Sequence, residues 1–371
     1  MFYLFLILIF TRPLFSSLAF PDSNFIHSAF LLFLLTAWVF KEKLSLNRLL
    51  PIKYPLILFC FSLIASIVFS QDRMNSVAEA YKYCIPLLIL WAVSNLDQRR
   101  KQLLVDCLMW AGFAVSLIAL RQYFFGFDDT LKFMAEQNIH DPEAVTVISR
   151  RRVFFPFVTP DVLAGYLIMI LPLALLRRKV LLAATIFFAL LLTRSLGGLV
   201  SLLLALSIYF CANRKLGRKA VLGLAGLLLA AVTIFIIRGM SPDGQLHPWF
   251  SVAMRLGYWQ DTLFIIKEHL LTGVGIGNFD LCNCRYSHNA YLQLWAETGI
   301  LGIASFIWLA GRTLRQNKGI SIVATALIAF LIHNFFEFTF FLPESAFICW
   351  TIVGLSLDED KRSVVSDVKK A

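Results

Sequence analysis

The sequence has little charge for its length. Only 15% of its 371 residues are charged, whereas 59% are hydrophobic. This leaves too little polar surface to cover a water-soluble protein, and the mean hydropathy of +0.74 agrees. Thirty-five Phe and eight Trp agree as well, because aromatic rings suit lipid and its interfaces. The composition therefore excludes a soluble globular protein and predicts a chain that lies mostly in a bilayer.

Motifs for metals and nucleotides are also scarce. The only Asp-x-Asp pattern is Asp358–Asp360, near the basic C-terminal end, and the glycines of Gly273–Gly277 lack the Lys-Ser/Thr of a P-loop. Cys282 and Cys284 precede His288, but two thiols and one imidazole fall short of a closed zinc site. We therefore expect neither a bound metal nor a cofactor.

Apolar runs dominate the chain, and each is read as a membrane helix because about 20 residues cross the hydrocarbon. Twelve such runs lie near 2–20, 25–40, 54–70, 80–96, 102–124, 158–176, 180–193, 195–212, 220–237, 289–310, 319–335 and 341–357. The sequence thus predicts an all-α polytopic membrane protein of about 12 transmembrane helices. A single transmembrane domain spans 1–357, and 358–371 form a charged tail.

Positive charge gathers on one side of these segments. That side holds 21 of the 34 basic residues and 7 acidic ones, or +14, and the other side carries −3, which together make +11. The bias follows the positive-inside rule, so the basicity indicates topology and not nucleic-acid binding. Both termini and the tail are then cytoplasmic. Two long loops, about 127–157 and 238–288, face the other side.

The second outer loop is predicted to contain a helix over 252–271. Its apolar side chains repeat at helical spacing, while five ionisable residues make it a poor span and a reasonable interfacial helix. The glycine-rich segment Gly273–Gly277 follows and is read as a turn or a re-entry at the lipid interface.

His288 stands where this loop meets an apolar helix, and Glu297 follows nine residues later. An ionisable group within such a helix is functional by default, and Tyr291 and Gly299 lie on neighbouring turns. A neutral imidazole, with an unperturbed pKa of about 6.5, accepts a proton from a hydroxyl near neutral pH. These residues alone leave His288 open between catalysis and helix capping.

The other histidines favour structural interpretations. His333 and Glu337 are four residues apart, which predicts one helical face and a polar lock between helices. The remaining histidines have no obvious partner and are expected to be interfacial or solvated: His27, His140, His247 and His269.

Arginines on the outer side form a second group: Arg150, Arg151, Arg152, Arg194, Arg255 and Arg285. Guanidinium groups bind phosphate oxygens in a bidentate fork, so several of them beside a membrane would suit a lipid-linked pyrophosphate. Contact with lipid headgroups is the alternative. It is favoured for Arg150 and Arg285, whereas the position of Arg194 between two apolar segments favours function.

The block around His288 resembles the signature of the O-antigen ligase and polymerase superfamily. The pattern is His288-Asn289, nine residues, Gly299, two residues and Gly302, preceded by Met254–Trp259 and Leu271–Phe279. Arg152–Tyr166 is similar to the segment that opens a middle helix in these proteins. The resemblance covers most of 55–357.

This resemblance implies a metal-independent, inverting glycosyltransferase with a C-type membrane fold in the bacterial inner membrane. Its glycan donor would be linked to undecaprenyl pyrophosphate at the periplasmic face. Carried over by position, His288 would activate the acceptor hydroxyl. Arg255 would hold the pyrophosphate together with Arg194 and Arg152. The supporting residues would be Asn289, Glu297, Tyr291 and Gly299.

Two positions depart from the family pattern. The family's Ser-Arg-Gly is replaced by Thr193–Gly198, with arginine displaced to 194 and Leu196 in its usual place. Two positions on a helix are a rotation of about 200°, so Arg194 is equivalent only if it precedes the helix. Asp161 stands where the family favours Asn, and its role is open.

Within this superfamily, the modest second outer loop and the short chain favour an O-antigen ligase that acts on lipid A–core in lipopolysaccharide biosynthesis. An O-antigen or exopolysaccharide polymerase differs only in its acceptor, and the growing glycan would replace the core. A lipid-linked oligosaccharide flippase or other transporter is the alternative of another class. Transporters show internal repeats and ionisable residues near the midplane, whereas this sequence shows no repeat and gathers such residues at one face.

Overall fold

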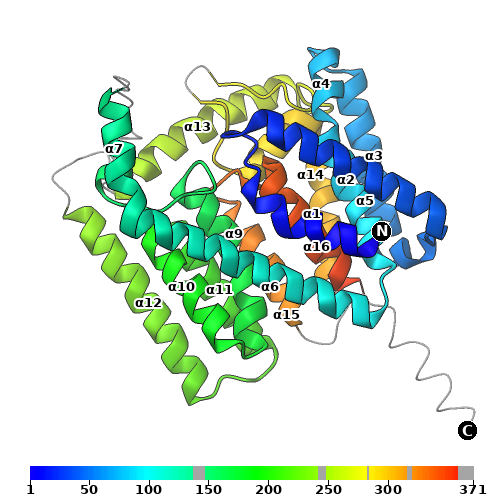
Figure 1. Cartoon of the computed structure of the whole chain (residues 1–371). Coiled ribbons are helices and arrows are strands. Elements are labelled where there is room, and N and C mark those ends of the chain that lie inside the picture. The colour runs from blue at the N-terminus through cyan, green and yellow to red at the C-terminus, as the bar shows by residue number, and fades with distance from the viewer. Residues whose placement is uncertain (137–146, 241–247, 282–283, 316–319, 358–371) are drawn as a thin grey trace, which may run out of the picture.

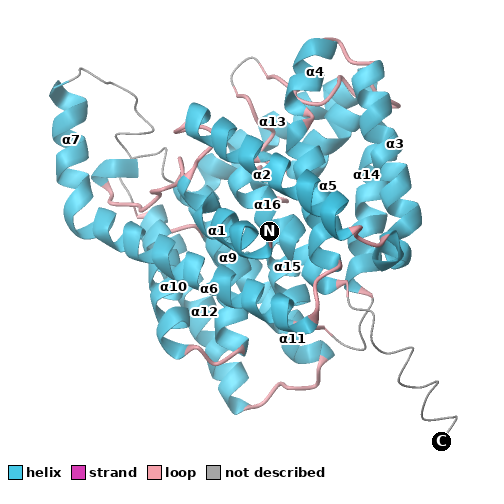
Figure 2. Ribbon diagram, turned by 45° about the vertical axis from the view of Figure 1, so that its right-hand side comes forward, coloured by secondary structure: helices cyan, strands magenta, loops and turns pink. Residues whose placement is uncertain are grey.

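A computed structural model describes residues 1–136, 147–240, 248–281, 284–315 and 320–357 as a bundle of helices (Figure 1). In chain order these are α1 (Phe2–Thr11), α2 (Pro21–Glu42), α3 (Lys53–Val68), α4 (Arg73–Glu79), α5 (Tyr81–Ser94), α6 (Gln98–Arg121), α7 (Phe127–Glu136), α9 (Pro160–Leu176), α10 (Val180–Thr193), α11 (Leu196–Ala212), α12 (Arg218–Gly239), α13 (Pro248–Glu268), α14 (Ala290–Leu314), α15 (Ile322–His333) and α16 (Pro343–Ser356). Short 3₁₀ and π segments join some of them. Figure 2 shows the same helical architecture from a second direction.

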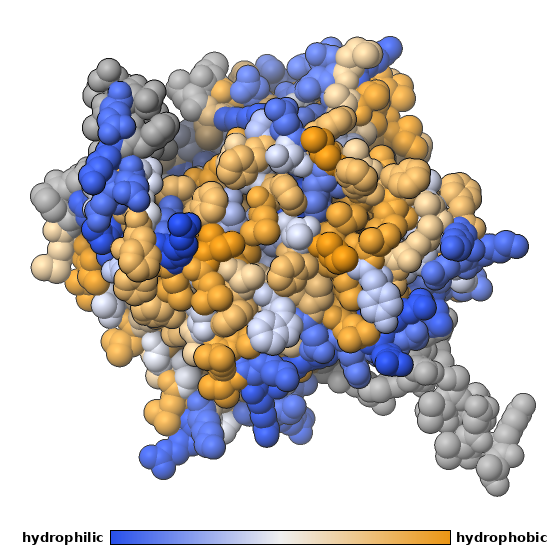
Figure 3. All heavy atoms as spheres, in the orientation of Figure 1, coloured by the Kyte–Doolittle hydropathy of each residue, from blue (hydrophilic) through white to orange (hydrophobic). Residues whose placement is uncertain are grey.

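The protein is a multi-pass membrane protein by the length and composition of its helices. Six of the described helices are long and apolar enough to cross a bilayer, and further apolar helices are shorter. Each of the twelve predicted segments overlaps a helix, although the number of crossings stays a prediction. Large apolar side chains such as Phe33 and Phe40 are about three-quarters exposed. Figure 3 shows a hydrophobic belt between hydrophilic ends.

Helix α9 lies in the interior of the bundle. All its residues from Val162 to Ala174 are buried, against α6, α10, α11 and α15. A helix that is apolar all round suits such an interior position. Thr159 caps its first turn, since the hydroxyl accepts a hydrogen bond from Val162 N at 3.2 Å. The interior position fixes Asp161, in the first turn, relative to the neighbouring helices.

Helix α14 is interrupted at Gly299, where φ is 69° and ψ is −176°. The interruption exposes backbone groups that the glycine-rich loop satisfies. Val274 N donates to Ala296 O at 2.8 Å, and Ile300 N donates to Leu270 O at 2.9 Å. Irregular backbone inside a membrane protein needs such partners. The loop therefore packs on protein as a turn, which is one of the two forms predicted for it.

A buried polar cluster joins the N-terminal segment to α16. Arg12 lies 3.7 Å from Glu344, and both side chains are fully buried. Arg12 also donates to Asn24 and lies 3.2 Å from Nδ1 of His27. The expectation that His27 is interfacial or solvated is wrong, because its partner is distant in sequence. His269 contacts Gln71, and two other histidines, 140 and 247, lie outside the described residues.

Helices occupy part of both predicted outer loops, 127–157 and 238–288. Helix α6 continues through a π-helical turn, Gln122–Gly126, into α7, so the predicted end at 124 is too early. A π turn adds a residue without breaking the helix, and the side chain of Gln122 accepts hydrogen bonds from Phe154 N and Phe155 N. Helix α13 matches the predicted 252–271 helix and lies across one end of the bundle (Figure 1).

Candidate active site

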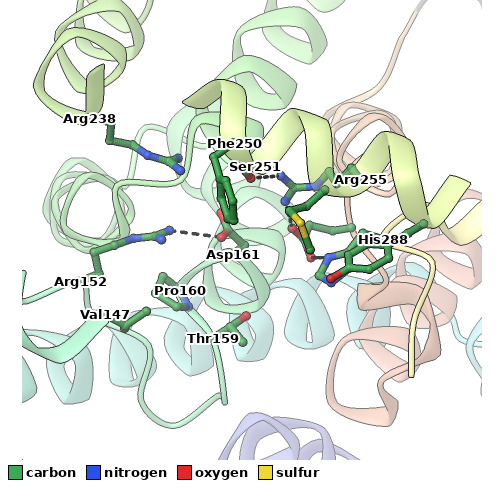
Figure 4. A pocket seen from close by; sticks show the side chains of 13 residues that line it. Val147, Arg152, Thr159, Pro160, Asp161, Arg238, Phe250, Ser251, Arg255 and His288 are labelled. Carbon is green, nitrogen blue, oxygen red and sulfur yellow. Dashed lines mark hydrogen bonds and ion pairs between the residues drawn. The ribbon is translucent and has the colours of Figure 1, made fainter. Parts of the chain in front are cut away.

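A cavity of about 280 Å³ opens at the end of the bundle covered by α13. Its lining comes from α9, α12, α13 and the segments before α9, before α14 and after α15. Three of the predicted site residues meet there, namely Arg152, Arg255 and His288. Figure 4 shows Arg152 and Arg238 entering from one side and Arg255 and His288 from the other.

The backbone at His288 is left-handed, with φ at 50°. Strained backbone of this kind persists where the surroundings hold it, and it clusters at functional sites. The neighbours hold it here. Ser287 Oγ donates to Asn289 O at 2.7 Å, and Asn289 Oδ1 accepts from Tyr291 N and Leu292 N at 3.0 and 3.1 Å. Asn289 is thus the N-cap of α14, which leaves the His288 side chain available to the cavity.

The His288 ring is held between two aromatic side chains. Tyr258 of α13 stacks on it with centroids 5.7 Å apart and planes 21° apart. Phe338 meets it edge-on at 5.0 Å. Its Nδ1 lies 3.5 Å from Oε2 of Glu337. The imidazole is therefore fixed in orientation by three contacts from two other segments.

Glu337 connects the histidine to the arginine on α13. The carboxylate is 3% exposed, and its Oε1 accepts from Arg255 Nη2 at 2.6 Å. Arg255 also donates to Ser251 and, through Nε, to Phe336 O at 2.9 Å. One buried glutamate thus positions the predicted base and the predicted pyrophosphate-binding residue together.

The predicted helical face shared by His333 and Glu337 is wrong. Helix α15 ends at His333, and the side chain of Asn334 accepts from Phe340 N at 2.9 Å, which turns the chain away. Glu337 therefore points to α13. His333 points to α9, where its Nε2 lies 3.1 Å from Asp161 O. Both side chains do make contacts between helices, but to different partners.

The charges of this group depend on one another. Burial lowers the pKa of His288, but the negative charge of Glu337 and hydrogen bonds to Cys284 and Glu337 outweigh it and raise the pKa to about 9. Burial acts against ionised Glu337, yet His288 and Arg255 lower the pKa of that carboxyl. Burial also opposes charge on Arg255, but Glu337 and then Asp161 raise its pKa.

These directions make the resting site ionic at neutral pH. Near neutral pH the cation is therefore the main form of His288, because Glu337 raises the pKa of the imidazole. The sequence did not reveal Glu337 as the partner of His288. A base role for His288 requires loss of a proton before an acceptor hydroxyl can donate one.

The opposite wall carries a second ion pair and a further arginine. Arg152 Nη2 lies 3.2 Å from Asp161 Oδ2, and Arg152 Nε donates to Thr193 O at 2.9 Å. Arg238, near the C-terminal end of α12, lines the same cavity. Sequence reasoning missed it. The available signal was a cation at the outer end of an apolar segment, where the positive-inside rule disfavours it.

Arg194 has a different position. It is the left-handed C-cap of α10, and Ser195 is the N-cap of α11. Arg194 therefore precedes α11, which was the condition for its equivalence to the family's arginine. However, the cavity lining contains Arg152 and Arg255 without Arg194. The preceding residue, Thr193, contacts Arg152 through its carbonyl.

The predicted supporting residues Glu297, Tyr291 and Gly299 stabilise the neighbouring structure and do not line the cavity. Glu297 is buried, and it accepts from Gly277 N at 3.2 Å and from Gln293 Nε2 at 3.0 Å. Tyr291 donates to Leu331 O at 2.6 Å. Gly299 forms the interruption of α14. Together they hold the glycine-rich loop and α14 in place beside the His288 turn.

Comparison with known proteins identifies part of the chain. Residues 181–307 match the model of the O-antigen ligase family. Over this stretch the chain is similar to the O-antigen ligases. This match confirms the resemblance to that superfamily and indicates a glycosyltransferase-like enzyme of the ligase or polymerase type. No curated protein matches the chain significantly.

The residues that match the family supply only part of the cavity. Arg238, Arg255 and His288 lie within the matched residues, whereas Arg152, Asp161 and Glu337 lie outside them. Within the described ranges, no group of three or more His, Cys, Asp or Glu side chains could hold a metal ion. One of the two cysteines near His288, at position 282, lies outside those ranges.

Proposed function

We propose that the protein transfers a glycan from undecaprenyl pyrophosphate to an acceptor hydroxyl at the periplasmic face of the bacterial inner membrane. Its most direct role is that of an O-antigen ligase, with lipid A–core as the acceptor. The observation that carries the proposal is the convergence of three arginines and His288, from four separate segments, on one cavity. The matched family supports lipid-linked glycan and acceptor substrates in general.

The cavity has the charge that a pyrophosphate donor needs. Its lining contains three guanidinium groups and two carboxylates, before the cationic His288 is counted. Arginine binds phosphate oxygens in a bidentate fork. Arg152, Arg238 and Arg255 would therefore bind the donor and stabilise the charge that develops on the leaving pyrophosphate.

Transfer then needs one base and no acid. The acceptor oxygen attacks the anomeric carbon, its new C–O bond forms as the bond to the pyrophosphate oxygen breaks, and the hydroxyl proton passes to His288. Undecaprenyl pyrophosphate leaves as an anion without a proton. Attack opposite the leaving group inverts the anomeric centre. Glu337, at 3.5 Å from Nδ1, would direct the other ring nitrogen to the acceptor.

The orientation of the site follows from the distribution of charge. Loops rich in lysine and arginine are cytoplasmic under the positive-inside rule, and the α10 and α12 starts carry Arg178, Lys179 and Lys219. Arg238 lies at the other end of α12 and lines the cavity. The cavity is therefore assigned to the periplasmic side, with both termini in the cytoplasm.

The glycan profile of a deletion strain tests this function. The strain would be complemented with wild-type protein or with His288→Asn, and lipopolysaccharide and polyprenyl-linked glycan would be analysed side by side. A ligase leaves bare lipid A–core and long glycan on the carrier when His288 is changed. Core with a single repeat would instead assign a polymerase. Unchanged profiles in both fractions would reject glycan transfer and favour transport or another acceptor.

A further inference from the structure

A second cavity, of about 460 Å³, lies between α9, α10, α11 and α12. Its walls are almost entirely apolar and include Phe187, Phe210 and Leu227, whereas one end carries Arg178, Lys179 and Lys219. It shares no lining residue with the His288 cavity. Its size lies within the range of ligand sites.

The cavity exists because α12 packs loosely on the bundle. Only Leu227, Ala231 and Ile234 are buried along this helix. A Cβ added at Gly223, which lines the cavity, would have no atom within 4 Å. Gly223 therefore leaves an apolar groove beside α10 and α11. In the bilayer, lipid chains would surround this groove.

The cationic end of the cavity has no counter-charge among the described residues. Within the described ranges, Arg178, Lys179 and Lys219 form no ion pair, whereas the adjacent Arg177 pairs with Asp106 at 2.9 Å. Helices α10 and α12 both begin here, without an acidic residue in either first turn. Helix N-termini carry partial positive charge and favour anions, so two helix ends and three cations act in the same direction.

We propose that this cavity binds an anionic diacyl phospholipid of the cytoplasmic leaflet. Its phosphate would contact Arg178, Lys179 and Lys219, and one acyl chain would fill the groove beside Gly223. Basic pockets between transmembrane helices on the cytoplasmic side are suited to anionic headgroups. The lipid would also brace α12, whose opposite end places Arg238 in the His288 cavity. The binding itself does not depend on the proposed function.

Lipid binding to the purified full-length protein tests the site directly. Phosphatidylglycerol and phosphatidylcholine with identical acyl chains would be titrated in detergent, with native mass spectrometry as the readout. Phosphatidylglycerol should bind more tightly. A triple variant, Arg178→Gln/Lys179→Gln/Lys219→Gln, should bind it about 100-fold more weakly, since each cation near an anionic lipid accounts for about a factor of five.

A matched control removes three other cytoplasmic-side cations, Lys41→Gln/Lys43→Gln/Lys53→Gln, which do not line the cavity. It should retain tight binding. A second variant, Gly223→Phe, places a large side chain in the groove at a position where a Cβ has open space. It should weaken binding while the thermal unfolding midpoint without lipid is kept.

Three results would overturn the proposal. The first is equal binding of the two lipids. The second is an equal loss of phosphatidylglycerol binding in the triple variant of the cavity and in the control triple variant. The third is unchanged phosphatidylglycerol binding by Gly223→Phe. Tighter binding of a polyprenyl phosphate that is lost in the cavity triple would reassign the cavity to a carrier lipid, and so would also reject a phospholipid site.

Discussion

Two buried glutamates beside the start of α14 have opposite surroundings. Glu337 faces an open cavity and is bound by the charged side chains of Arg255 and His288. Glu297 faces the glycine-rich loop and is bound by a backbone amide and by Gln293. Both side chains are buried to the same degree, at 2% exposure, so burial does not distinguish them.

The difference lies in the partners. A carboxylate bound by a backbone N–H fixes a loop, and its partner has no further chemistry to perform. A carboxylate shared between a guanidinium and an imidazole sets the charge and direction of groups that can act on a ligand. The Glu337 group should therefore control chemistry, and the Glu297 group should control stability. The following predictions test that distinction.

The largest effect is expected for His288→Asn. Loss of a positioned base reduces a rate by about a hundred- to ten-thousand-fold, while asparagine tolerates the left-handed backbone at this position. Turnover of polyprenyl-linked glycan by purified protein measures the change, with the thermal unfolding midpoint as the control. A variant that keeps full activity would remove His288 from the mechanism.

A smaller loss of activity is expected for Arg255→Lys. Lysine keeps the charge but cannot form the bidentate fork, and a lost hydrogen bond to a charged group corresponds to about a ten- to hundred-fold change. The loss should be greatest at low donor concentration, because binding is affected. Arg285→Lys is the matched control, since Arg285 lines a small separate pocket beside Glu297 and not the His288 cavity. Equal effects of the two would contradict the pyrophosphate assignment.

Gly299→Ala should reduce stability more than any change in the His288 group. A Cβ at this position would lie 2.0 Å from Leu271 O, and φ is 69°, so we expect a loss of about 3 kcal/mol from strained backbone. Thermal unfolding in detergent measures it. Gly311→Ala, in the same helix with open space around its Cβ, is the control and should be neutral. If Gly299→Ala and Gly311→Ala lowered the unfolding midpoint equally, the interruption of α14 would not be important for stability.

The smallest effect, and the most specific, concerns pH. If neutral His288 is the base, kcat/KM rises with pH toward the pKa of about 9. Glu337 raises that pKa, so Glu337→Gln should move the midpoint of the rise to lower pH. Glu297→Gln should leave the midpoint unchanged and lower the unfolding temperature. Activity that falls as pH rises through 9 would mean that His288 acts as a cation.

The sequence by itself determined the helical membrane architecture and one block of the site. A membrane segment is encoded by a continuous apolar run, because each helix satisfies its own backbone hydrogen bonds. The family pattern around Arg255 and His288 is also local, since both fall within 254–302. Even Asn289, Glu297 and Gly299 were found in this block, although their roles were not.

Only the tertiary structure decided which distant groups meet. Arg152, Arg238 and Glu337 come from separate segments, and no spacing in the sequence predicts that they share a cavity with His288. Electrostatic interaction depends on distance and burial, so the pKa of His288 could not be inferred before Glu337 was placed beside it. For the same reason Glu297 and Glu337, chemically identical in sequence, became a loop anchor and a site residue through their neighbours.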